Sequence, residues 1–253
     1  MATLNRDGVA IHYETYGQGP AILLSHGYSA TCRMWDGQIA ALRDHYQVIV
    51  WDMRGHGESD YPPDPAAYSE AATVADMAAV LRAENIQRAV IGGLSLGGYM
   101  SLAFHRMHPA MVRALMIFDT GPGFRKAEAR DAWNQRALQR AADLDSRGLA
   151  ALGTSDEVRM SRHRNASGLA GAARGMLTQH DDSVIASLER IAVPSLVLVG
   201  SNDTNFLAAT DYMARKIRDA TKVVIDHAGH ASNLHQPAAF NRSVESFLAS
   251  LPP

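Results

Sequence analysis

The 253-residue sequence contains a single cysteine, Cys32, which excludes an internal disulfide. It also has no uninterrupted apolar run near the roughly 18 to 20 residues that span a bilayer, although 47% of its residues are hydrophobic. The opening stretch MATLNRDGVA has no apolar core of the kind found in secretory signal peptides. These absences predict a cytoplasmic protein.

An excess of one charge sign is missing as well. The 24 basic and 26 acidic residues leave a net charge of -2. Proteins that bind nucleic acid or an anionic membrane usually carry an excess of basic residues. The balance therefore predicts a small molecule as partner, with no nucleic acid and no membrane, and it leaves a homo-oligomer open. Internal repeats and low-complexity tracts are absent too.

Short apolar runs recur along the chain and are separated by helical patterns. The first segment alternates around Asp7-Gly8, which indicates an antiparallel hairpin. Residues 69–84 predict a helix capped by Ser69, and a second helix follows Ser95. Continuous apolar runs occupy 21–25, 47–51, 89–93, 114–118, 195–199 and 222–225. Each run is typical of a strand buried on both faces of a parallel sheet. The pattern indicates an α/β fold class with one mostly parallel sheet.

One interval interrupts this alternation. About 75 residues separate the strand that ends near Asp119 from the strand that begins at Ser195, far more than a crossover needs. The interval is rich in Ala and Arg and has helical spacing. We therefore predict a helical lid at 121–190, inserted after the sixth strand of a core formed by 1–120 and 191–253.

The stretch Gly93-Leu94-Ser95-Leu96-Gly97 fits the G-x-S-x-G pattern, in which a strained turn lifts a nucleophilic serine above a sheet. It follows a predicted strand and opens a predicted helix, which is the context that this pattern requires. A serine hydroxyl is nearly inert at neutral pH and needs a base that is itself oriented by an acid. Ser95 is therefore the candidate nucleophile.

His230 and Asp203 are the candidate base and acid. His230 follows the last predicted strand in HAGHASN, and Asp203 follows strand 195–199 in GSND. Both loops lie at the sheet edge that carries Ser95. The chain order Ser95, Asp203, His230 is the order expected of hydrolases with this elbow. The neighbouring His227 and His235 are interpreted as loop histidines.

A second candidate acid is Asp119, which ends strand 114–118 in FDTGPG. Its position does not exclude it, but capping of the turn before Gly121-Pro122 is a sufficient explanation for an aspartate there. Asp203 is the preferred acid.

A tetrahedral intermediate needs two hydrogen-bond donors already in place. The backbone N–H of Leu96, at the start of the helix after Ser95, is one candidate. The backbone N–H of Tyr28 is the other, because Gly27 permits a sharp turn after strand 21–25. His26 has no partner at ligand spacing and is interpreted as a turn-stabilising residue. We expect no cofactor and no metal.

Four motifs of the sequence match those of a known protein family: SHGYSA, WDMRGHGESD, GLSLGG, and GSND with HAGHASN. On these motifs the chain resembles the α/β-hydrolase fold superfamily, of the small-substrate esterase and lactonase type. The resemblance implies a mostly parallel eight-stranded sheet flanked by helices, and a structural turn at Asp52, Arg54, Gly55 and Gly57. Relatives that are haloalkane dehalogenases or epoxide hydrolases have aspartate at the elbow, so Ser95 argues against both activities. GLSLGG together with MWDGQ is closer to enol-lactonases of aromatic catabolism.

The leading hypothesis is a serine hydrolase that cleaves a small carboxylic ester or lactone through an acyl-enzyme on Ser95. A perhydrolase, an acyltransferase or a C–C bond hydrolase would use the same triad, although relatives that cleave C–C bonds usually carry asparagine where Leu94 stands. A ligand sensor without turnover is the alternative from another class. The predicted lid also contains a basic cluster, Arg159, Arg162, His163 and Arg164. This cluster is either a solvated helix face or a group at the pocket mouth that favours acidic substrates.

Overall fold

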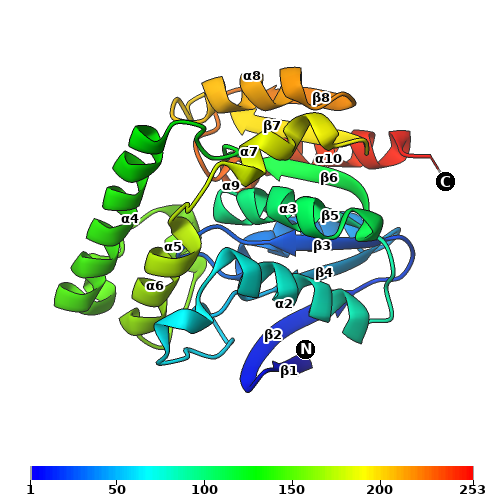
Figure 1. Cartoon of the computed structure of the whole chain (residues 1–253). Helices are drawn as coiled ribbons and strands as arrows, with labels where there is room; N and C mark the ends of the chain where they lie inside the picture. Colours follow the sequence, from blue (N-terminus) through cyan, green and yellow to red (C-terminus); the bar gives the residue numbers. More distant parts are fainter. Residues whose placement is uncertain (1, 253) are drawn as a thin grey trace.

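The computed structural model describes residues 2–252, and its centre is one eight-stranded sheet (Figure 1). The strand order is β1-β2-β4-β3-β5-β6-β7-β8. β1 and β2 form an antiparallel hairpin, β2 pairs antiparallel with β4, and all other pairs are parallel. The strands span Ala2–Arg6 (β1), Val9–Tyr16 (β2), Ala21–Ser25 (β3), Gln47–Trp51 (β4), Ala89–Leu94 (β5), Val112–Phe118 (β6), Ser195–Gly200 (β7) and Ala220–Ile225 (β8). The predicted mostly parallel sheet is confirmed.

Helices cover both faces of this sheet. α2 (Glu70–Ala83), α3 (Leu96–Met107) and α8 (Leu207–Lys216) pack on one face. α1 (Asp36–Leu42) and α10 (Pro237–Ser250) pack on the other, with the short α9 (Ser232–His235) beside them. The carboxyl ends of the parallel strands meet at one edge, which is where ligands bind in such sheets.

Alternate residues of the central strands point to opposite faces and enter two separate cores. In β3, Ile22 and Leu24 join the cluster that contains Trp35 and Phe240. Leu23 joins the cluster under α2 and α3. The continuous apolar runs of the sequence therefore reflect burial on both faces, as predicted.

β8 departs from that prediction. It is the last strand of the sheet, and Lys222 and Val224 are exposed. The expectation that the run 222–225 is buried on both faces is wrong, because an edge strand has a neighbour on one side only.

The predicted local signals are present at the hairpin and at α2. Asp7 and Gly8 have φ values of 52° and 82°, as a tight hairpin turn requires. The hydroxyl of Ser69 accepts a hydrogen bond of 3.0 Å from the backbone N–H of Ala72 and caps α2.

The segment between β6 and β7 is helical. It contains α4 (Ala127–Arg147), α5 (Asp156–Met160), α6 (Ala166–Ala172) and α7 (Ser183–Ser187), and Figure 1 shows α4, α5 and α6 grouped at one end of the sheet. α4 and α6 share a small apolar cluster of their own, whereas Val184 and Leu188 belong to the core under α3. The function of 121–190 as a lid, and its boundaries, stay predictions.

None of the helices within residues 2–252 combines the length and apolar character needed to cross a membrane.

Candidate active site

Ser95 occupies a strained turn between β5 and α3. Its φ of 55° and ψ of -116° are unusual for a residue other than glycine, and its backbone N–H donates to the carbonyl of Phe118 at 2.9 Å. Close packing explains the flanking glycines. A Cβ on Gly97 would overlap the carbonyl oxygen of Ser25, and a Cβ on Gly93 would overlap the backbone of Gly97. The G-x-S-x-G pattern therefore marks a turn that larger residues could not form.

The predicted oxyanion donors are the backbone N–H groups of Leu96 and Tyr28. Leu96 is the first residue of α3, where N–H groups have no partner within the helix. Gly27 approaches Ser95 closely enough that a Cβ built on it would lie 3.5 Å from the Ser95 Cβ, so Tyr28 follows directly beside the elbow. The Tyr28 hydroxyl donates to the carbonyl of Leu169 at 2.8 Å, which ties this loop to α6. An oxyanion hole formed by Tyr28 and Leu96 stays a prediction.

The structure brings the predicted base and acid together. His230 Nδ1 and Asp203 Oδ2 are 2.7 Å apart, and Asp203 is 5% exposed. The Phe206 ring stacks on the imidazole with ring centroids 5.2 Å apart, and it also lines the cavity that contains Ser95. Within residues 2–252, Ser95 and His230 form no direct hydrogen bond. Catalytic hydrogen bonds are often loose without substrate.

The environment of His230 favours its charged form. Burial disfavours the imidazolium, but the hydrogen bond and charge of Asp203 outweigh it, with further help from the charges of Asp119 and Glu157. The pKa of His230 is consequently raised above its usual value.

This shift gives a pH prediction. A general base must be neutral to accept the proton of serine, so kcat/KM for ester hydrolysis should rise with pH as the imidazolium loses its proton. Because the pKa is raised, the midpoint should lie above the ordinary histidine value of 6.5. Initial rates with a neutral ester from about pH 5 to 9 measure it. A flat profile or a lower midpoint would contradict the assignment of His230 as base.

Asp119 does not have the predicted role in the Gly121-Pro122 turn. It is fully buried, and it accepts hydrogen bonds from the Gly200 N–H at 2.8 Å and from the Ser232 hydroxyl. Burial raises its pKa to about 7, against the lowering effect of these two hydrogen bonds. Asp119 thus links the end of β6 to β7 and α9. The turn-capping interpretation is wrong because the carboxylate points across the sheet instead of along its own loop.

His235 and His26 make local structural contacts. The His235 Nδ1 accepts a hydrogen bond of 2.9 Å from the Gly229 N–H and so shapes the loop that carries His230. His26 Nε2 accepts from the Met53 N–H at 2.9 Å, and its Nδ1 lies 2.7 Å from the Gly27 carbonyl. The turn-stabilising interpretation of His26 agrees with these contacts.

The cavity beside Ser95 has a volume of about 110 Å³. Its apolar wall comprises Leu96, Tyr99, Pro122, Phe124, Trp133, Met176, Leu177, Phe206 and Ala209. Its polar members are Ser95, Thr120, Gln179 and Asn205. None of these described residues carries a charge at neutral pH.

The predicted basic cluster makes its contacts outside this wall. Arg159 pairs with Asp156 at 3.5 Å, and Arg164 pairs with Asp60 at 3.7 Å. His163 lies 3.0 Å from the Ser29 carbonyl. None of the cluster lines the Ser95 cavity within the described chain.

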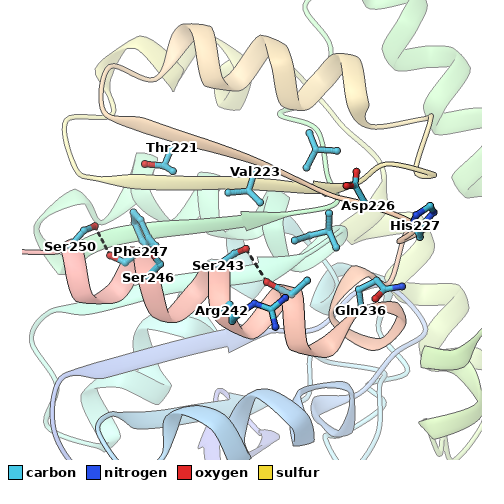
Figure 2. Close-up of a pocket in the computed structure, with 13 residues that line it drawn as sticks. Thr221, Val223, Asp226, His227, Gln236, Arg242, Ser243, Ser246, Phe247 and Ser250 are labelled. Atoms are coloured by element: carbon cyan, nitrogen blue, oxygen red, sulfur yellow. Dashed lines mark hydrogen bonds between the residues drawn. The ribbon is translucent and has the colours of Figure 1, made fainter.

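A larger groove of about 780 Å³ runs along β8 and α10 (Figure 2). His227 and Asp226 lie at one end of it, and Ser250 at the other. Ser95, Asp203 and His230 are not among the described residues that line this groove. His227 therefore belongs to a different surface from the elbow.

One buried trio has the composition of a metal site. The potential ligand atoms of His12, Glu14 and Cys32 lie within 4.8 Å of one another. However, the Arg33 guanidinium donates to the Glu14 carboxylate and, at 3.4 Å, to the Cys32 sulfur. His12 Nε2 lies 3.0 Å from Glu14 Oε1. Burial raises the pKa of the Cys32 thiol, whereas a metal ligand must be a thiolate. The guanidinium and the neutral thiol favour a hydrogen-bonded structural network.

Phe206 and Gln179 were not predicted as site residues. Phe206 follows the predicted acid by three residues, and an aromatic so close to that loop was a usable signal. Gln179 lies in the helical insertion, where no motif marks it.

Known proteins resemble the chain over nearly its whole length. The model of the alpha/beta hydrolase family matches residues 22–243. The chain is 32% identical to 3-oxoadipate enol-lactonase 2 of Acinetobacter baylyi, an alignment that covers 97% of this chain and 96% of the relative. It resembles the crystal structure of the enol-lactonase from Burkholderia xenovorans LB400 with a TM-score of 0.80 and 25% identity, over 98% and 100% of the two chains.

A third similarity is to the structure of a thermophilic esterase from Thermogutta terrifontis, with a TM-score of 0.82 and 28% identity over 98% and 97% of the two chains. The relatives include several hydrolases, and the family match extends from β3 into α10. This chain belongs to the alpha/beta hydrolase family and is a hydrolase of that family.

Proposed function

We propose that the protein cleaves a small carboxylic ester or lactone through an acyl-enzyme on Ser95. The observation that carries the proposal is the position of Ser95 on its strained elbow, in a cavity lined by Phe206. The Phe206 ring stacks on His230, which is hydrogen-bonded to Asp203. A nucleophile, a base and an orienting acid are the parts that acyl transfer requires.

The chemistry would run in two steps. The Ser95 hydroxyl attacks the substrate carbonyl while His230 takes its proton, and Asp203 holds the imidazole in the required tautomer. The N–H groups of Tyr28 and Leu96 stabilise the oxyanion. His230 then protonates the leaving alcohol, and it later activates the water that releases the acid. In a lactone the leaving alcohol is part of the same molecule, so ring opening leaves a hydroxyacyl group on Ser95, and water then releases it as a hydroxy acid.

Relatives named as enol-lactonases and as an esterase support an ester or lactone substrate. The small cavity with uncharged walls also supports a compact, neutral one.

Covalent labelling tests the nucleophile directly. A fluorophosphonate should add one equivalent to the folded protein, and peptide mapping should find it on Ser95. No labelling, or labelling at another serine, would overturn the proposal. A panel of small esters and lactones measures turnover in parallel, and added peroxide or alcohol reveals whether the acyl group passes to an acceptor other than water.

The surface position of the basic cluster predicts the effect of removing its charge. The side chain of Arg159 is 66% exposed, and exposed charges interact weakly with distant ligands because water and salt screen them. Arg159→Gln and Arg162→Gln should therefore change KM for a carboxylate-bearing ester and for its neutral counterpart by the same factor, within about twofold. A selective rise of KM for the anionic ester would place this cluster at the pocket mouth after all.

A further inference from the structure

The side chain of Gln179 is a buried polar group without a partner beside Ser95. Gln179 is 9% exposed and lines the same cavity. Within residues 2–252, its Oε1 is shielded from solvent and has no hydrogen-bond partner. Native structures leave few buried polar atoms unpaired, and each one calls for an explanation.

Helix α4 holds the backbone of Gln179 in place. The Asn134 side chain donates to the Gln179 carbonyl at 2.9 Å and accepts from its N–H at 2.8 Å. Trp133 Nε1 donates to the Leu177 carbonyl at 2.7 Å. Three hydrogen bonds thus hold the segment, and a movement that exposed the amide to water would have to break them.

The amide points toward the wall formed by Gly123 and Tyr99. A Cβ on Gly123, whose φ is 91°, would lie 2.9 Å from the Gln179 Oε1 and 3.4 Å from the Tyr99 ring. Because Gly123 has no side chain, the amide has room there. Gly123 and Tyr99 both line the Ser95 cavity, so Oε1 is positioned at its edge.

Nearby hydroxyl groups are already engaged elsewhere. The Tyr99 hydroxyl donates to Glu70 at 2.9 Å, and the Thr120 hydroxyl donates to the Ser95 carbonyl at 2.7 Å. Neither is free to donate to Gln179. A molecule bound in the cavity can supply the missing donor.

We propose that Gln179 determines substrate specificity, with its Oε1 accepting a hydrogen bond from a hydroxyl or amide N–H on a neutral ester or lactone bound beside Ser95. This inference rests on the proposed function. A carboxylate would be a poor substitute for that donor, because it has no proton to give to Oε1 and no cation lines the described wall of the cavity.

Matched substrate pairs test this directly. Each pair is an ester or lactone with a hydroxyl or acylamino group and the same carbon skeleton without it, with the group placed at successive positions. For at least one pair, the wild type should favour the donor-bearing member in kcat/KM by about 10- to 100-fold, because the alternative leaves Oε1 unpaired. Hydroxyl and acylamino pairs separate the two kinds of donor.

The variant Gln179→Met keeps the size of the side chain and removes the amide. The preference should fall to about twofold or less, through a loss with the donor-bearing substrate alone. Leu177→Met is the matched control, because it places the same new side chain on the same wall without touching a hydrogen-bonding group. That control should keep the wild-type ratio.

The proposal is overturned if the wild type shows a ratio near one for every pair, the result expected if an ordered water is the permanent partner of Oε1. A preference that survives in Gln179→Met also overturns it. If Gln179→Met does not fold, the wild-type ratios alone decide. Failure here leaves turnover of the plain esters and fluorophosphonate labelling of Ser95 intact, whereas failure of the proposed function removes both.

Discussion

Replacement of Ser95 by alanine should lower kcat/KM for the best ester or lactone substrate on the order of 10⁴-fold or more. The hydroxyl is the only group removed, and the members of a nucleophile, base and acid set act as a unit. The elbow should persist, because it depends on the close packing of Gly93 and Gly97 against Ser25. Initial rates give the loss, and thermal unfolding followed by circular dichroism gives the stability.

Ser101→Ala is a matched control for this change. Ser101 lies on α3 and is buried, and its hydroxyl donates to the Gly97 carbonyl at 2.8 Å. The same atom is removed six residues along the chain, and activity should stay within a few fold of wild type. Substantial turnover by a well-folded Ser95→Ala protein would overturn the assignment of the nucleophile.

The second large effect is expected from Asp203→Asn. Asp203 Oδ2 lies 2.7 Å from His230 Nδ1, and an amide there leaves the imidazole in the wrong tautomer with its charged form unsupported. The corresponding change in serine proteases costs about 10⁴-fold in kcat. We expect a comparable loss, measured as kcat with the same substrate.

Asp119→Asn is the control, because it makes the same chemical change at the other candidate acid. Asparagine can still accept from the Gly200 N–H and can donate to the Ser232 hydroxyl, so the links to β7 and α9 survive. Most of the activity should remain. If the two folded variants behave the other way round, the acid belongs after β6 and Asp203 is a structural residue.

Much of the fold is encoded in short segments whose meaning does not depend on distant partners. The apolar runs gave β3 and β7 at their observed starts, because a strand covered on both faces needs apolar residues at successive positions. Ser69 and Asp7-Gly8 marked a helix start and a turn through hydrogen bonds and φ values that are local by nature. The sequence pattern of the elbow at Ser95 is likewise local, because its glycines are neighbours in the chain, although their packing partner Ser25 is distant.

Residues of the candidate site could be predicted only where they directly follow a strand that the sequence predicts. Asp203 and His230 could be assigned because each follows a strand, and parallel strands bring their carboxyl ends to one edge. The hydrogen bond between them and the stacking of Phe206 required the structure.

By itself, the sequence determined the strands, the elbow and the candidate acid and base, since these depend on neighbouring residues and on chain order. Only the tertiary structure decided that β8 is an exposed edge, that Asp119 bonds across to Gly200 and Ser232, and that the Gln179 amide is buried beside the Ser95 cavity. The physical reason is the same for all three. Burial and hydrogen-bond partners are set by segments far apart in the sequence, and no local pattern records which of them will meet.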